Sequence, residues 1–230
     1  MAASKIIENY KDSLISDTRP VQPVKKIDGS LRELVKNKRH LQNLLILMFL
    51  WIVSAFDYYL INFQLKYIDG DIYTNTIISS VSEVTAYLVS GALYDRIGPK
   101  VSFIGSFALA VVGSILLIFL GDHYVAFVPA MILGTKFGIS GSFNVVYLAN
   151  SLFPPIYSST TFGAFNFFAR LFSMIAPPFA EFKKPLPMSL FCVLALAAAI
   201  SSAFLRSDKD KEGKPEADIS MQNKKNSSSE

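Results

Sequence analysis

The sequence predicts an all-α membrane protein with six transmembrane helices and both termini in the cytosol. Hydrophobic residues make up 51% of the 230 residues, whereas Asp, Glu, Lys and Arg make up only 17%. Soluble domains are nearer a quarter charged. Apolar runs of membrane-crossing length follow one another, separated by short polar joints. Basic residues gather at the two termini and in the joint at 95–100, which lies on the same side of the membrane. This bias predicts that side to be cytosolic.

Each apolar run comes close to the roughly 20 residues that a bilayer crossing needs. The helices are predicted at about residues 41–65, 74–94, 101–120, 125–153, 158–180 and 187–206. The joints are short and rich in Gly, Pro or charge, so neighbouring helices run antiparallel. A buried soluble helix is the alternative for any single run, and six runs in series argue against it.

The two ends of the chain are polar. Residues 1–40 contain nine Lys and Arg and no run of signal-peptide length, which predicts a cytosolic arm with a short helix around residues 30–40. Residues 207–230 are rich in charge, Ser and Asn, which predicts a disordered cytosolic tail. Seventeen of the 22 Lys and Arg fall on the side of the termini and three on the other. This bias explains the net charge of +4 without nucleic acid, and it does not say which membrane holds the protein.

Ionisable residues interrupt four of the apolar runs. Each costs roughly 2.5–3.5 kcal/mol at the centre of a membrane helix, and such residues often mark a pathway for substrate or ions. Two acids and two bases could pair across a shared interior, or they could hold helices together or lie nearer a membrane face. Tyr147 shares a helical stripe with the base at 136, and Asn166 shares one with the base at 170. The candidate substrate-binding or ion-coupling residues are therefore Asp57, Glu83, Lys136, Arg170, Tyr147 and Asn166.

Few residues suit enzymatic or metal chemistry. The chain has one Cys and two His, too few for a disulfide framework or a Cys- or His-based metal site. No G-x-S-x-G, H-E-x-x-H or Walker sequence occurs. We therefore expect neither an enzyme nor an ATP-driven pump, no catalytic residue, and no cofactor or metal.

The joint after the second predicted helix carries a motif. Gly91, Asp95, Arg96, Gly98 and Lys100 lie in the sequence GALYDRIGPK. This stretch resembles the G-x-x-x-D-R-x-G-R-[RK] signature of the major facilitator superfamily, which lies between the second and third helices of a six-helix half. The resemblance implies that these five residues belong to a cytosolic gate.

Other segments strengthen the resemblance, which spans about residues 30–205. Leu44–Val84 looks like the seventh and eighth helices of the organic-ion transporters of that superfamily, and Glu83 matches their eighth-helix glutamate. The stretch from Lys136 to Leu148 resembles their tenth helix, and Thr160 to Pro177 the eleventh. The resemblance implies the C-terminal six-helix half of a twelve-helix bundle. Organic-anion members carry an arginine at the place of Arg170, which slightly favours anionic substrates.

Two departures from the family pattern leave two functions open. Ser151, Ser158 and Pro99 stand where the family has a glutamate and two arginines of the gate, and the chain resembles one half only. The first hypothesis is a secondary, alternating-access transporter of small organic ions that works with a second six-helix half or as a homodimer. The second is a transport-inactive, transporter-derived subunit of a larger membrane complex. Both place the chain in a lipid bilayer.

Overall fold

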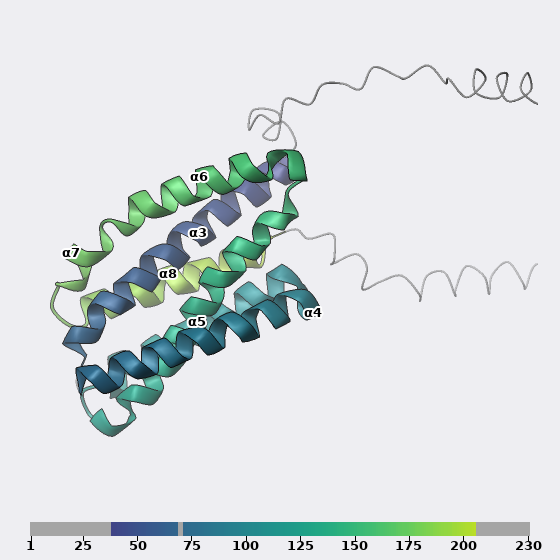
Figure 1. The fold of residues 1–230 in the computed structure, drawn as a ribbon. Coiled ribbons are helices and arrows are strands. Elements are labelled where there is room, and N and C mark those ends of the chain that lie inside the picture. Colours follow the sequence, from purple (N-terminus) through teal and green to yellow (C-terminus); the bar gives the residue numbers. More distant parts are fainter. Residues whose placement is uncertain (1–37, 69–70, 206–230) are drawn as a thin grey trace, which may run out of the picture.

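The computed structural model describes residues 38–68 and 71–205, and the regular elements of these residues are all helical (Figure 1). The predicted tail at 207–230 and nearly all of the predicted arm at 1–40 lie outside the described residues. The α-helices are α3 (Lys38–Gln64), α4 (Ile72–Leu120), α5 (Val128–Leu148), α6 (Pro155–Ser173), α7 (Ala176–Ala180) and α8 (Leu186–Ser202). The 3₁₀ turns are η1 (Leu65–Tyr67), η2 (Val125–Phe127) and η3 (Ala149–Leu152).

The starts of the helices follow from local chemistry. Asp71 caps α4, because its carboxylate accepts hydrogen bonds from the backbone N–H of Thr74 at 2.8 Å and from its hydroxyl at 2.7 Å. Both bonds favour the ionised form and lower the pKa of Asp71, the side-chain bond most strongly. Four later helices, α5 to α8, have proline in their first two positions, where no amide donor is needed.

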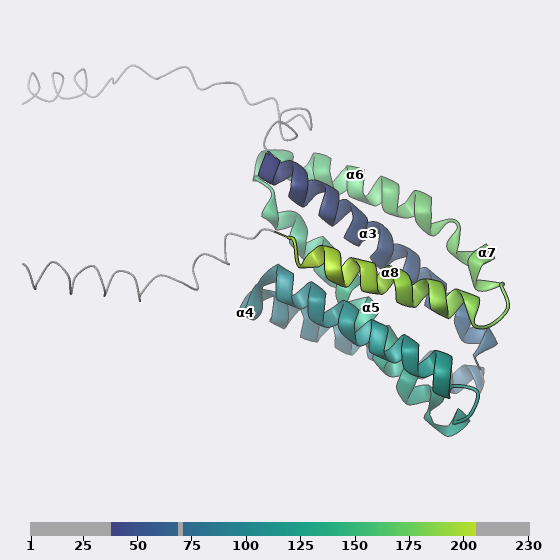
Figure 2. The ribbon, with the colours of Figure 1, turned by 180° about the vertical axis from the view of Figure 1, so that it is seen from behind.

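Helix α4 is two helices joined by a sharp reversal. Gly98 has φ 83° and ψ 172°, a conformation that side-chain-bearing residues rarely adopt. Ser90 and Ser106, on opposite sides of this glycine, both lie against Gly141 of α5. The two halves therefore fold back side by side, as Figures 1 and 2 show. The predicted joint at 95–100 corresponds to this reversal.

The predicted single helix at 158–180 is divided. Helix α6 ends at Ser173 and α7 begins at Ala176. Pro177 and Pro178 lack the N–H groups that would have bonded the carbonyls of Ser173 and Met174, so the α6 ladder cannot continue. The helical stretch is thus interrupted where the hydropathy runs on, because hydropathy does not register the missing donors, and a crossing at 158–180 stays a prediction.

The helices pack in a fixed order around one core. Helix α6 packs on α3, α3 packs also on α5, α7 and α8, and α4 packs on α5 and α8 (Figure 2). Close approach of α4 and α5 depends on glycine, since a Cβ at Gly138 would overlap the backbone nitrogen of Ala110. Trp51 of α3 anchors the core and contacts the rings of Tyr147 and Phe165.

Three helical stretches of the described chain are long and apolar enough to cross a bilayer, judged by length and composition. They are His40–Tyr67, Ile72–Leu120 and Val125–Leu152, and α8 is apolar but shorter. Because the second stretch reverses at Gly98, it holds two of the predicted helices. Six crossings and cytosolic termini stay predictions.

Candidate functional site

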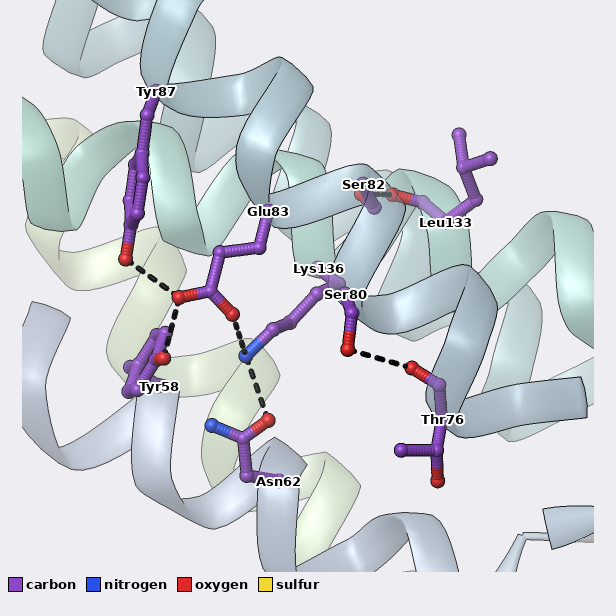
Figure 3. A network of polar contacts seen from close by, with 9 residues as sticks. All are labelled: Tyr58, Asn62, Thr76, Ser80, Ser82, Glu83, Tyr87, Leu133 and Lys136. Atoms are coloured by element: carbon purple, nitrogen blue, oxygen red, sulfur yellow. Dashed lines mark hydrogen bonds and ion pairs between the residues drawn. The ribbon is translucent and has the colours of Figure 1, made fainter. Parts of the chain in front are cut away.

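A carboxylate, an ammonium and two phenols meet where α3, α4 and α5 converge (Figure 3). Glu83 of α4 accepts hydrogen bonds from the hydroxyls of Tyr58, at 2.6 Å, and Tyr87, at 2.7 Å, both on Oε1. Its other oxygen, Oε2, lies 3.4 Å from Nζ of Lys136 on α5. Two of the four charges expected inside the helices thus form an ion pair, and each Glu83 oxygen has a partner.

Lys136 is the more deeply buried member of this pair. Its side chain is 0% exposed, whereas that of Glu83 is 23% exposed. The ammonium also donates to Oδ1 of Asn62 at 2.7 Å and lies 3.8 Å from the centre of the Tyr58 ring. A buried cation needs such partners, because desolvation disfavours its charge. We name Tyr58, Asn62, Glu83, Tyr87 and Lys136 the polar cluster.

Arg170 occupies a different setting. The residue is exposed and lies in an open groove between α3 and α6, and Nη1 donates to the hydroxyl of Tyr59 at 2.5 Å. Among the described residues it has no carboxylate within ion-pair distance. The groove is lined by Tyr59, Phe63, Gly163, Asn166, Phe167, Arg170, Leu171, Ser173, Met174 and Pro177. An unpaired guanidinium on an aromatic wall can bind a planar anion.

Aromatic rings connect the groove to the polar cluster. Tyr58 and Tyr59 are consecutive on α3, and their ring centres lie 5.4 Å apart at nearly a right angle. Tyr58 stacks on Phe143, whose centre is 5.4 Å from Tyr147. The candidate residue Tyr147 therefore belongs to this row of rings but does not line the groove. Asn166 does line the groove, and its Nδ2 donates to the Phe162 carbonyl.

Asp57 stands apart from the other three charges. It is 0% exposed, and neither carboxylate oxygen has a hydrogen-bond partner. The structure therefore does not pair all four charges in one interior: it joins Glu83 to Lys136 and leaves Asp57 and Arg170 separate.

The expected gate motif surrounds the reversal in α4. Gly98 supplies the positive φ of the turn, and Gly91 and Lys100 are half-buried. Asp95 and Arg96 are exposed and take part in no ion pair with another described residue. Nearby, the hydroxyl of Tyr94 lies 2.9 Å from Oγ of Ser151, and Asn150 donates to Oγ of Ser158 at 2.7 Å. The gate role of the motif stays a prediction.

Four polar residues of the site, Tyr58, Tyr59, Asn62 and Tyr87, were not among the candidates. Tyr87 lies one helical turn after Glu83, so helical spacing could have indicated it. Asn62 lies one helical turn after Tyr58, so helical spacing could have indicated it. Tyr59 could not have been found in this way, because its role depends on how α6 packs against α3. Residues 38–68 and 71–205 bring together no group of three or more His, Cys, Asp and Glu that could hold a metal ion.

Comparison with known proteins decides the family. A family model described as Major Facilitator Superfamily matches residues 8–177. The chain belongs to the major facilitator superfamily. Like its relatives in this superfamily, it is an integral, multi-pass membrane protein.

The relatives found include members of solute carrier family 22 and a named organic cation/carnitine transporter. Solute carrier family 22 member 15 of Xenopus tropicalis is 30% identical over 177 residues, covering 71% of this chain and 33% of the relative. Human solute carrier family 22 member 13 is 25% identical, covering 77% and 33%. Human organic cation/carnitine transporter 2 is 28% identical, covering 68% and 29%. The chain spans about a third of the length of these relatives.

Proposed function

We propose that the chain forms the C-terminal six-helix half of a secondary transporter that moves small organic ions, with a preference for organic anions. The observation that carries the proposal is the exposed guanidinium of Arg170 in a groove lined by Tyr59, Phe63 and Phe167. The relative named organic cation/carnitine transporter 2 supports small organic ions as the substrate class, and the preference for anions rests on Arg170.

The charges of the site favour an anion. Glu83 already has Lys136, Tyr58 and Tyr87 as partners, so little of its charge is left for a cationic substrate. Arg170 has only the neutral hydroxyl of Tyr59, so its fork of N–H donors is available to a carboxylate or sulfonate. Asn166 would add a polar contact, and the aromatic rings that line the groove would hold the apolar part of the substrate. Tyr147 would extend this surface through its ring contact with Phe143, which stacks on Tyr58.

A second half would complete the site. Within the described residues, α6 packs chiefly on α3. Beside the groove, Phe167 and Leu171 of α6 are 64% and 51% exposed, and Met174, directly after α6, is 73% exposed. These apolar side chains flank Arg170 and the groove. A six-helix half or a second copy seated on this side would enclose the substrate near the middle of the membrane, as alternating access requires.

Equilibrium binding to the particle purified from the native membrane and placed in lipid nanodiscs tests the proposal, because this particle would include the second half that completes the site. The probes are a radiolabelled aromatic carboxylate, tetraethylammonium and carnitine. Arg170→Gln is expected to weaken carboxylate binding about ten- to a hundredfold, the effect of losing a hydrogen bond to a charged group. Arg170→Lys keeps the positive charge but loses the planar set of guanidinium N–H donors. Its carboxylate affinity should therefore lie between those of the original chain and Arg170→Gln. Lys183→Gln, which changes an exposed lysine outside the groove, is the matched control and should bind as the original chain does.

The three probes separate the possible outcomes. Loss of carboxylate binding in Arg170→Gln with unchanged tetraethylammonium binding supports the anion site. Binding of tetraethylammonium alone contradicts the preference for anions. A folded protein that binds none of the probes contradicts the assignment of the groove as a substrate site.

A transport-inactive subunit is the second candidate function, and one observation favours it. Ser151 and Ser158, which stand where the family has a glutamate and an arginine, take part in neutral hydrogen bonds with Tyr94 and Asn150. A neutral network lacks the ion pairs expected to break and form during a transport cycle. Purification from the native membrane distinguishes the two functions: a homodimer or a pair with another six-helix half supports transport, and a single copy among unrelated subunits supports the alternative.

A further inference from the structure

Asp57 is an acid that the substrate site does not use. It lies in the C-terminal half of α3, is 0% exposed, and has no hydrogen-bond partner on either carboxylate oxygen. An ionised carboxylate without a partner is strongly disfavoured in an apolar interior, and such a group takes up a proton instead. The burial and the missing partners together indicate a neutral carboxyl group.

The packing of α3 against α5 places a second unpartnered group at the same level. Oγ of Ser54 on α3 donates to Oγ of Ser142 on α5 at 3.2 Å. Two turns farther along α3, Asn62 accepts from Lys136 of α5. This antiparallel register puts Asp57 level with Ser140, whose buried hydroxyl also lacks a partner. A protonated carboxyl group donates one hydrogen bond and a hydroxyl accepts one, so the two groups complement each other.

The charged groups around α3 have other partners. Lys136 pairs with Glu83 and Asn62, and Arg170 bonds Tyr59. The titratable side chains on the described elements that contact α3 are Glu83 and Tyr87 on α4, Lys136 and Tyr147 on α5, Tyr157 and Arg170 on α6, Cys192 on α8, and Lys66 and Tyr67 on η1. None of them makes a hydrogen bond to the Asp57 carboxylate. No described cation lies within ion-pair distance of Asp57 either, so nothing compensates a charge on it directly.

We propose that Asp57 is a proton-binding site: its carboxyl group carries a proton in this conformation and exchanges it with water when α3 and α5 separate. In the exchange the O–H bond breaks, the proton passes to an entering water molecule, and the carboxylate keeps the electron pair. The ligand is a proton rather than a metal cation, because a metal needs several oxygen ligands at once and the described residues offer no acidic cluster. The proposal goes beyond the proposed function and does not depend on it.

Infrared difference spectroscopy of the full chain in lipid nanodiscs tests the site without any substrate. At neutral pH the C=O stretching band of a protonated carboxylic acid is expected, and it should be absent from Asp57→Asn. Asparagine has nearly the shape of the neutral acid, so this variant is expected to fold, and the fluorescence of Trp51 checks that it does. Asp71→Asn changes an exposed acid and is the matched control, in which the band should remain.

Transfer to heavy water tests the exchange. The band should shift as deuterium replaces the proton, while most backbone amides of α3 stay protected. A missing band in the original chain at neutral pH, or a band that persists in Asp57→Asn, overturns the site. A band that never shifts in heavy water overturns the exchange. These results do not depend on probe binding, so failure of this proposal is distinct from failure of the proposed function.

Discussion

The ion pair of the polar cluster predicts that Glu83→Gln destabilises the protein more than Lys136→Met does. Glu83→Gln removes the negative charge that compensates the fully buried ammonium of Lys136 and leaves it neutral partners such as Asn62, which is expected to cost about 3–5 kcal/mol of unfolding free energy. Lys136→Met leaves a partly exposed carboxylate that keeps both tyrosine hydroxyls, at a cost of about 1–3 kcal/mol. Methionine is unbranched and fills the space of the lysine stem.

The double variant Glu83→Gln with Lys136→Met removes both charges. The double variant should lose less unfolding free energy than Glu83→Gln alone, because replacing both members of a buried ion pair often changes stability little. Denaturation in mixed micelles measures all three, with the fluorescence of Trp51 as the probe, since it is the single Trp of the chain and lies in the core. Ser80→Ala removes only a local bond to the Thr76 carbonyl and serves as the control. Equal losses of unfolding free energy in the two single variants would refute the reasoning. A double variant whose loss equals the sum of the two single losses would also refute it.

Three further predictions concern the fold. Gly138→Ala should cost about 1–3 kcal/mol, because its Cβ would overlap the Ala110 backbone, whereas Gly134→Ala faces open space and should cost little in the same denaturation assay. Gly98→Ala should cost about 1–3 kcal/mol through backbone strain at φ 83°, with Gly105→Ala as its control; equal midpoints would contradict the strain. The lowered pKa of Asp71 means that its cap contributes stability above the unfolded-state pKa of about 3.9 and loses it as pH falls through the folded value. The Thr74 amide should therefore lose its hydrogen bond on acidification, as followed by its NMR shift, and in Asp71→Ala that shift should no longer depend on this titration.

Much of the helical layout could be predicted from hydropathy and from breaks in it. The joint at Gly98 was expected because its neighbours are charged and because Gly and Pro end helical runs. The division between α6 and α7 was not expected, since Pro177 and Pro178 are apolar and leave the hydropathy of the run intact. Hydropathy reports the cost of side-chain transfer, and it does not report a missing backbone donor.

The site could be predicted only in part, for a related reason. Helical spacing shows which residues share a face of one helix, and it identified Glu83 and Lys136 as polar positions. It does not show which helices meet or at what register. The pairing of Lys136 with Glu83 and Asn62, the contact of Arg170 with Tyr59 and the isolation of Asp57 all follow from packing between helices distant in sequence.

Counterflow of a labelled aromatic carboxylate tests the proposed transport most directly. The particle purified from the native membrane is reconstituted into liposomes preloaded with the unlabelled carboxylate, beside the same particle carrying Arg170→Gln. The account predicts transient accumulation of label by the original particle and its loss in the variant, with Trp51 fluorescence unchanged in both. A folded original particle that accumulates no label, or an Arg170→Gln particle that accumulates as much as the original, would contradict it.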